Sequence, residues 1–496
     1  MRITNKMMTN NMMNNINKNK LSMTTLEQQY STGKKIQRPS DDPIVTVRAL
    51  KLRTNLSELD QYYEKNIPDA TSWMDVTESA LSTVNDILKQ INTYCVQGST
   101  DTLTGSDRSS IVQNLEQMKN QIYQEGNTNY AGRYVFTGYK TDSPLIFTEA
   151  SNNLTYSITE NITGEQIQIK NRVTDTYELD DFGSSTFDAA PQLVKTNRIQ
   201  LSYDNLSNTK PSEIHYFKEN TLGDVEEQLP PFTAITSISV THPGAYKPAA
   251  GTANYIPETG EIILSDSVYE ELRTSENMKI TYSKTGFSQG DLKPEHYFDC
   301  EMTDSAKPEQ DPIKYTKTKQ QIQYEINYNQ KLTVNTEGSD AISHQIGRRI
   351  DDILEAVNDV VQVEAKITEI DKRLQDTTLS DTDKAIYEKM KEQMDTELEL
   401  KKETMQAAFE KGITSSTEEQ DRVNIAVADL GSRHVRLDMT ENRLSSQKVD
   451  FEDLLSTNED VDMVDTVIKY NAAETIYNAS LSAASKVVQK SLLDFL

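Results

Sequence analysis

Apolar side chains recur at helical spacing near both ends of the chain. Close to the N-terminus they fall at intervals of three, four and seven residues, and close to the C-terminus one set recurs every seven residues. A stripe of this kind is stable only against a partner helix, so we expect the two ends to pair in a coiled-coil rod from which the middle projects. The first set is Met12, Ile16, Met23, Leu26 and Tyr30, and the second is Val423, Leu430, Leu437, Leu444 and Phe451.

The segment between the first two predicted helices cannot be helical throughout. A helix over residues 4–32 is expected to end at Gly33, because glycine tolerates the left-handed conformation that often follows a helix. Pro39 favours extended geometry in the residue before it, so the stretch KKIQRPSDDP predicts a turn. Asp42 followed by Pro43 then predicts an N-cap with proline at the first position of a second helix.

The second helix has one apolar face and is expected to end at Pro68, since proline lacks the backbone donor that a helix needs. Two further helices are predicted around residues 81–95 and 111–122, the latter capped by Ser106 and stopped at Gly126. Residues 1–140 therefore form the N-terminal half of the rod. The apolar face of the second helix consists of Val45, Leu52, Leu56, Leu59 and Tyr63, which we interpret as rod core together with the heptad set.

Residues 141–340 differ in composition from the flanking regions. Glycine, proline, threonine and asparagine become frequent, and apolar residues alternate with period two, as at Ile322, Tyr324, Ile326 and Tyr328. We predict a β-rich outer region, divided into two subdomains near residue 228. The fold class is thus α+β and multidomain, with long terminal helices and an inserted β-rich centre.

Residues 341–496 are predicted to form the C-terminal half of the rod. A charged helical hairpin is expected near residues 365–415, with Ser380 and Asp383 at capping-box spacing on its returning helix. A separate heptad helix is expected to start near Thr417, and Ser456 with Glu459 is expected to cap the last helix. The apolar positions of this last helix and of the chain end are Val461, Val464, Ile468, Ile476, Leu492, Leu493, Phe495 and Leu496.

Charge and cysteine content narrow the range of partners. Lysine and arginine number 51 against 77 aspartate and glutamate residues, a net charge of −26 that repels nucleic acid and anionic lipid. No apolar run approaches the roughly 18 residues that span a bilayer, and no signal-peptide core is present. Cys95 and Cys300 support neither a disulfide framework nor a thiolate metal site.

The chain shows no catalytic or cofactor motif. Its 5 histidines lie far apart and match no metal-ligand spacing, and no phosphate-binding loop or nucleophile elbow occurs. The tripeptide at Asp181, Phe182 and Gly183 matches a kinase motif by letter only. We therefore expect no enzyme activity, no cofactor and no metal.

The motifs above resemble those of one protein family. The stretch STGKKIQRPSDDP resembles the signature shared by bacterial flagellins and hook-associated proteins, and MRITNKMM, NTNYAGRYVFTGYKTDSPLIF and SLLDFL are more similar to the junction members than to flagellin. The resemblance covers residues 1–147 and 343–496 apart from the hairpin, so residues 226–315 and 365–415 look like insertions. The signature positions here are Gly33, Pro39, Ser40, Asp41, Asp42 and Pro43.

This resemblance implies a structural adaptor that joins the flagellar hook to the filament outside the cell. Its terminal helices would be disordered in the monomer and would become ordered in a ring of copies, between hook-associated protein 1 and flagellin. It also implies export by the flagellar type III apparatus without a cleaved signal peptide, and a cytoplasmic secretion chaperone. The outermost ends, Met12 to Tyr30 and Val461 to Leu496, would then form the assembly interface.

Other interpretations remain open at this point. The chain could be a divergent flagellin, which would occur along the whole filament. It could also be a flagellar scaffold that displays an enzymatic or adhesive central domain. An intracellular coiled-coil signalling protein would need uninterrupted heptads, which the β-rich region breaks.

Overall fold

The computed structural model describes residues 5–100, 103–211, 213–219, 225–228, 232, 234–242, 244–376 and 378–493, and over 487–493 it describes the backbone alone. Long helices at both ends of the chain flank a β-rich middle, which confirms the predicted α+β class. The chain divides into two compact units with boundaries that differ from the predicted ones. Unit 1 consists of residues 1–70, 324–332 and 435–496, and unit 2 of residues 71–323 and 333–434.

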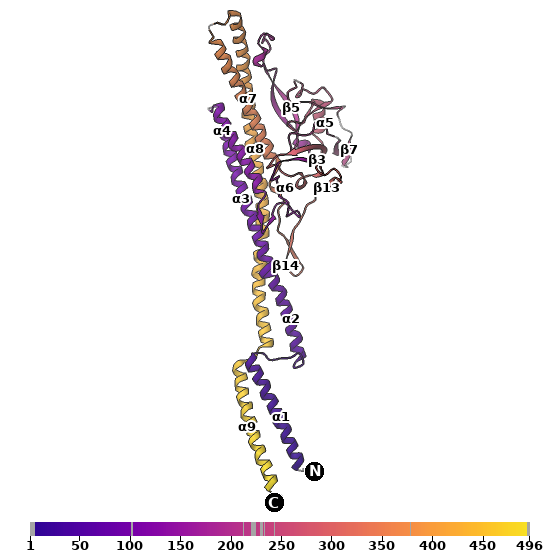
Figure 1. The fold of residues 1–496 in the computed structure, drawn as a ribbon, viewed down its shortest axis with the longest axis vertical. Coiled ribbons are helices and arrows are strands. Elements are labelled where there is room, and N and C mark those ends of the chain that lie inside the picture. The colour runs from indigo at the N-terminus through magenta and orange to yellow at the C-terminus, as the bar shows by residue number, and fades with distance from the viewer. Residues whose placement is uncertain are drawn as a thin grey trace. The chain divides into compact units, whose positions relative to one another are not determined.

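Unit 1 is built from helices of both chain ends and one hairpin. Its first and last helices, α1 (Asn5–Thr32) and α9 (Met463–Leu493), lie side by side, with the two chain termini at their free ends (Figure 1). The second group comprises α2 (Pro43–Asp60), the π-helix η1 (Gln61–Asn66), the end of α8 (Asp381–Glu459), and the hairpin of β14 (Gln323–Asn327) and β15 (Gln330–Thr333).

Pro68 does not end the second helix, contrary to the prediction. The chain continues from α2 through η1 into α3 (Ile67–Gly98), and the N–H of Ile67 bonds to the carbonyl of Tyr62, five residues earlier. A π turn is wider than an α turn, so it makes room for the ring of Pro68 where an α-helix would clash with it. A proline after a π turn is therefore compatible with a continuous helix.

The predicted break near Thr417 is also absent, because α8 is one helix of 79 residues. Just before Thr417, Ser416 donates a hydrogen bond to the carbonyl of Ile413 in the preceding turn, and beyond it Glu419 accepts one from Ser343 at 2.7 Å. Ser456 likewise lies inside α8, and the last helix is capped by Asp462, whose carboxylate accepts from the N–H groups of its first turn. Ser380 precedes α8, and its hydroxyl oxygen accepts from the N–H of Asp383 at 3.1 Å, which is one of the two bonds of the predicted capping box.

Helices of unit 2 bury the first two residues of the heptad set, Val423 and Leu430. Alongside α3 and α8 it contains α4 (Gly105–Glu125), capped by Thr104 and not by Ser106, and α7 (His344–Leu374), which runs antiparallel to the first part of α8. Asn85 of α3 bonds to Asn424 of α8 at 2.9 Å, so Val423 and Leu430 belong to the seam with α3. The heptad face of α8 therefore packs against more than one helix along its length, and not against the second helix alone.

The β-rich region consists of two sheets whose strands alternate along the chain. One sheet has the order β4-β5-β10-β9-β8 and the other β13-β12-β3-β11-β6-β7. All their pairings are antiparallel except that of β8 with β9. The strands are β3 (Ser151–Ile162), β4 (Gln168–Thr174), β5 (Gln192–Gln200), β6 (Glu213–Glu219), β7 (Val225–Gln228), β8 (Ala234–Ser237), β9 (Thr252–Ile256), β10 (Glu261–Leu264), β11 (Asn277–Phe287), β12 (Asp299–Asp304) and β13 (Ile313–Tyr315).

The predicted division near residue 228 is wrong. Strand β11 pairs with both β3 and β6, and β10 pairs with β5, so strands from both sides of residue 228 share each sheet. One hydrophobic core also joins the sheets, with Ile158, Ile199, Tyr255 and Ile280 all buried in it. The segment 226–315 is therefore an integral part of one β domain.

A loop that precedes β5 packs against the helical hairpin, a contact that the sequence analysis did not predict. Tyr177, Phe182 and Phe187 pack onto the hairpin, and the ring of Phe182 stacks on Tyr387 with centroids 4.1 Å apart. Phe187 is 1% exposed, so this contact is part of a real core. The hairpin is thus held from one side by the stretch 177–187.

Candidate assembly surface

The two chain ends contact each other along one face of α1 and one face of α9. The side-chain amide of Asn19 donates to the hydroxyl of Ser480 at 3.0 Å, and the rings of Tyr30 and Tyr470 stack with centroids 6.4 Å apart. Ile16 is buried at the same contact, at 9% exposure. A pair of helices can bury only the stripe that each turns toward the other.

The remaining faces of both helices expose large apolar side chains. On α9, Val464, Ile468 and Ile476 are 71%, 62% and 54% exposed. Contiguous apolar surface of this kind is unusual in a monomer and typically marks a surface that another chain covers. The other exposed apolar residues of the two helices are Met7, Met8, Met13, Leu21, Tyr30, Met463 and Leu481.

The predicted assembly residues fall into different environments. Ile16 is buried within the chain itself, whereas Met12, Met23 and Leu26 are half-buried along the pair. Val461 precedes α9 and is half-buried. Leu492 and Leu493 end α9, where the backbone alone is described, and Phe495 and Leu496 lie outside the described residues.

Sequence reasoning missed part of the exposed set. It followed a single stripe on α1, whereas Met13 and Leu21 lie on other faces of that helix. The signal was present, because apolar residues on more than one face of a helix indicate more than one partner. The exposed surface of α1 is therefore broader than the predicted stripe.

The predicted signature forms the turn that connects α1 to α2. Gly33 has a φ of +72° and its N–H bonds to the carbonyl of Gln29 at 2.8 Å, as expected for a residue that ends a helix. The carboxylate of Asp41 accepts from the N–H of Arg38 at 2.9 Å and stabilises the turn. Asp42 caps α2 by accepting from the N–H of Val45 at 3.1 Å, with Pro43 at the first helical position.

This turn is bonded to the link between α8 and α9. The N–H of Lys35 donates to the carbonyl of Glu459 at 2.7 Å, and the N–H of Val461 donates to the carbonyl of Gly33 at 2.9 Å. The Lys34 ammonium bonds to the carboxylate of Asp460, which raises the pKa of Lys34 and lowers that of Asp460. These two links, which we call the linker clasp (residues 33–35 and 459–461), are more than 400 residues apart, so local patterns do not predict that they lie together.

Replacing Asp42 by alanine is expected to lower the stability of α2 by about 1 kcal/mol, because the N–H groups of its first turn lose their acceptor. Thermal unfolding of the purified chain measures this change. Asp42→Asn is the matched control, because an asparagine side chain caps about as well and removes only the charge. Equal loss in both variants would contradict the capping role.

Half of the predicted core positions are buried. Leu59, Val423, Leu430, Leu437 and Leu444 are at most 5% exposed. The remaining predicted positions, Val45, Leu52, Leu56, Tyr63 and Phe451, are half-buried. On α2, the helix that carries three of the half-buried positions, Ile44, Val47 and Leu50 are exposed, so this helix too has apolar surface that its own unit does not cover.

The buried titratable groups of the described part show no catalytic arrangement. Burial lowers the pKa of His296 and of His344 to about 3, so both are neutral at pH 7. Burial raises the pKa of Cys95 and of Cys300 to about 12, which leaves both as thiols. Within the described residues there is no group of histidine, cysteine and carboxylate side chains placed to hold a metal ion. No helix described here is long and apolar enough to cross a membrane.

Both ends of the chain match models of known helical regions. Residues 3–141 match the bacterial flagellin N-terminal helical region, and residues 413–496 match the bacterial flagellin C-terminal helical region. The matched segments contain α1, α9, the signature turn and both halves of the linker clasp. The β-rich middle and the hairpin lie between them.

Relatives of known name match part of the chain. Flagellar hook-associated protein 3 of Salmonella typhimurium is 33% identical over 144 residues, which are 29% of this chain and 45% of the relative. Flagellin of Escherichia coli K12 is 29% identical over 203 residues, which are 39% of this chain and 38% of the relative. The chain thus spans less than half the length of these two relatives.

A solved structure of the flagellar junction protein from Legionella pneumophila aligns over 84% of this chain and 100% of its own, at 12% identity and a TM-score of 0.29. So low a TM-score adds no weight to the sequence matches. The N-terminal region of flagellins matches the N-terminal part of this chain and the C-terminal region matches its C-terminal part, whereas residues 142–412 lie outside both matches. The two ends of the chain therefore match the terminal helical regions of bacterial flagellins, and the chain is similar in sequence to flagellar hook-associated protein 3.

Proposed function

We propose that this chain is a structural protein of the flagellum that joins the hook to the filament. The observation that carries the proposal is the pair of terminal helices: they lie together by one face and expose Val464, Ile468 and Ile476 on another. A surface of this kind gains stability when neighbouring chains cover it. The 33% identity to hook-associated protein 3 over 144 residues supports the junction over other positions in the flagellum.

The partners follow from a position between hook and filament. Copies of this chain would form a ring, with hook-associated protein 1 on one side and flagellin on the other. Each chain would bury the exposed apolar faces of α1 and α9 against its neighbours, so assembly and ordering of the ends would occur together. Before export through the flagellar type III apparatus, a cytoplasmic chaperone would cover α9. No cleaved signal peptide and no enzyme activity are required.

A divergent flagellin is the second candidate, because flagellins match the same end regions. The two functions differ in where the protein lies and in how many copies each flagellum holds. Gold-labelled antibodies against the chain, applied to isolated flagella, separate them. We expect a single band of label at the boundary of hook and filament, whereas label along the whole filament would contradict the junction role and support flagellin.

A further inference from the structure

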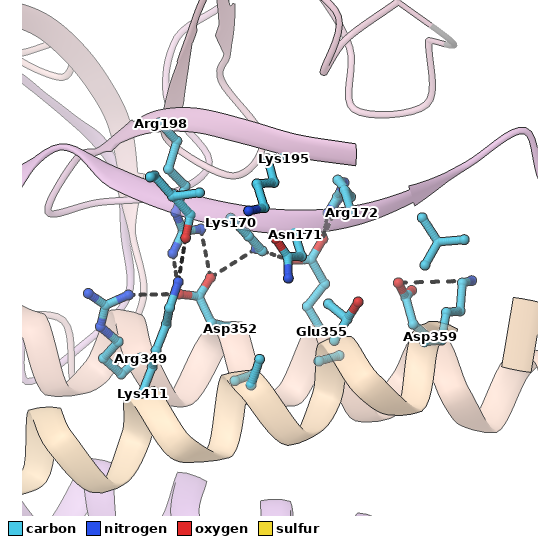
Figure 2. A pocket seen from close by; sticks show the side chains of 17 residues that line it. Lys170, Asn171, Arg172, Lys195, Arg198, Arg349, Asp352, Glu355, Asp359 and Lys411 are labelled. Carbon is cyan, nitrogen blue, oxygen red and sulfur yellow. Dashed lines mark hydrogen bonds and ion pairs between the residues drawn. The ribbon is translucent and has the colours of Figure 1, made fainter. Parts of the chain in front are cut away.

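A cavity of about 300 Å³ lies within unit 2, between the edge strand β4 and the helices α7 and α8 (Figure 2). Three small side chains, Ala356, Ala407 and Ala408, leave this space open along the helices. Lysine and arginine outnumber carboxylates in the lining, although the whole chain has a net charge of −26. The cavity is therefore a local region of positive charge on an acidic protein.

Ion pairs neutralise most of these cations. Lys170 lies 2.8 Å from Glu355 and 3.1 Å from Asp352, and Arg172 lies 2.8 Å from Glu355. Arg198, at 1% exposure, is paired with Asp352 and also with Glu261 of β10. At the other end of the helices, Lys401 lies 3.0 Å from Glu397. These ion pairs join β4 and β5 to α7, and the carboxylates neutralise the lysine and arginine side chains that they contact.

Lys411 is different, because its ammonium is paired with no carboxylate of the described residues. It donates to the carbonyl of Ile169 and stands beside Arg198 and Arg349, as Figure 2 shows. Burial lowers the pKa of Lys411, and these two guanidinium groups lower it further. Burial also lowers the pKa of Arg349, and Asp352 only partly opposes this change. Positive charge at this end is therefore in excess of what the protein itself compensates.

A second lysine lines the same cavity without an ion pair in the described part. Lys195 is exposed on β5, at the position that pairs with Asn171 of β4. Two uncompensated ammonium groups at one cavity, with neutral alanine surface beside them, match a ligand that has an anionic head and a small organic body. The guanidinium of Arg198 already binds carboxylates and the amide oxygen of Gln168. Its N–H groups are therefore not available for a two-point contact with a carboxylate ligand.

We propose that this cavity binds a small phosphate monoester, with the phosphate at Lys411 and Lys195 and the organic body over Ala356, Ala407 and Ala408. Lysine binds phosphate as a point charge, which suits a tetrahedral dianion more than a planar carboxylate. The site lies on the β domain and the hairpin, outside the end regions that match flagellins. It would let the exposed part of the protein bind phosphorylated small molecules independently of assembly.

Calorimetric titration of the full-length chain at low ionic strength tests this site with three probes of related shape. Phenyl phosphate supplies head and body, inorganic phosphate supplies the head alone, and benzoate replaces the phosphate by a carboxylate. We expect one molecule of phenyl phosphate per chain, bound at least tenfold more tightly than either other probe. Lys411→Met and Lys195→Met should each weaken phenyl phosphate at least tenfold.

Lys402→Met is the matched control, because Lys402 lies on the same helix α8 but outside the cavity lining. It should bind phenyl phosphate like the unchanged chain. Lys411→Met should also melt no lower than the unchanged chain, since it removes a cation that no carboxylate pairs. No binding of phenyl phosphate, unchanged binding in both lysine variants, or a preference for benzoate or inorganic phosphate would each overturn the proposal.

Discussion

Cells that produce the chain with both Ile468 and Ile476 replaced by aspartate are expected to lose their attached filaments and to release flagellin into the medium. Both side chains are more than half exposed, so the folded monomer loses no core contact. In an assembled ring the aspartates would be buried without a partner, at a cost of about 3 kcal/mol each. Because about 1.4 kcal/mol is a factor of ten, each substitution weakens the contact roughly 100-fold. Electron microscopy of cells and immunoblots of the medium measure the two effects.

The matched control places the same two charges on another part of α9. Asn478 and Ser485 are exposed and polar and lie on the opposite side of α9 from Ile476, so Asn478→Asp with Ser485→Asp changes the net charge equally without replacing an apolar side chain. We expect normal filament numbers from this control. Normal numbers from the isoleucine variant as well would show that the apolar face of α9 is not the assembly interface, whereas filament loss in both would indicate a general effect of charge.

Replacing Arg198 by methionine is expected to destabilise the β domain by about 3–5 kcal/mol at pH 7, because Asp352 and Glu261 would lose the guanidinium that pairs with both. Hydrogen exchange of the amides in β5 and β10 measures this change, since these strands carry Arg198 and Glu261. The control is Arg273→Met, at a residue whose side chain is 53% exposed and paired only with Glu270 nearby. Its cost should stay below about 1 kcal/mol.

The pH dependence of this difference gives a second check. Burial would raise the pKa of Glu261, but Lys170 and Arg198 lower it from 4.5 to about 2. A carboxyl group with a lowered pKa contributes stability above its unfolded value, and this contribution is lost as the pH falls from about 4.5 to 2. Without Arg198 the pKa of Glu261 should rise, so the two proteins should differ less in stability at pH 2 than at pH 7. A difference that does not change with pH would contradict the ion-pair explanation.

Local patterns in the sequence predict the terminal helices and their turn well. The heptad spacing of Val423, Leu430, Leu437 and Leu444 predicts burial, and all of these side chains are buried. The same spacing does not reveal the partner, because one stripe can pack against successive helices. Gly33 and Asp42 are likewise predictable, since each acts within four residues of its own position.

Features that depend on distant residues could not be predicted in this way. The two sheets interleave because β10 pairs with β5 and β11 with β3, and the alternation within a strand carries no information on its neighbour. Arg198 and Asp352 are 154 residues apart, so the cavity and its charges are invisible in local patterns. At Pro68 a local rule failed, because a π turn relieved the clash on which the rule depends.

In the proposed position between hook and filament, the linker clasp has a mechanical consequence. Because residues 33–35 and 459–461 are bonded to each other, the links to α1 and to α9 are joined at one level. A pull on the paired helices therefore loads two covalent strands in parallel, and each strand carries about half the tension. When one link bears more tension than the other, the hydrogen bonds between them transmit part of that tension to the second link. One terminal helix would therefore not separate from the other when only one of them is pulled.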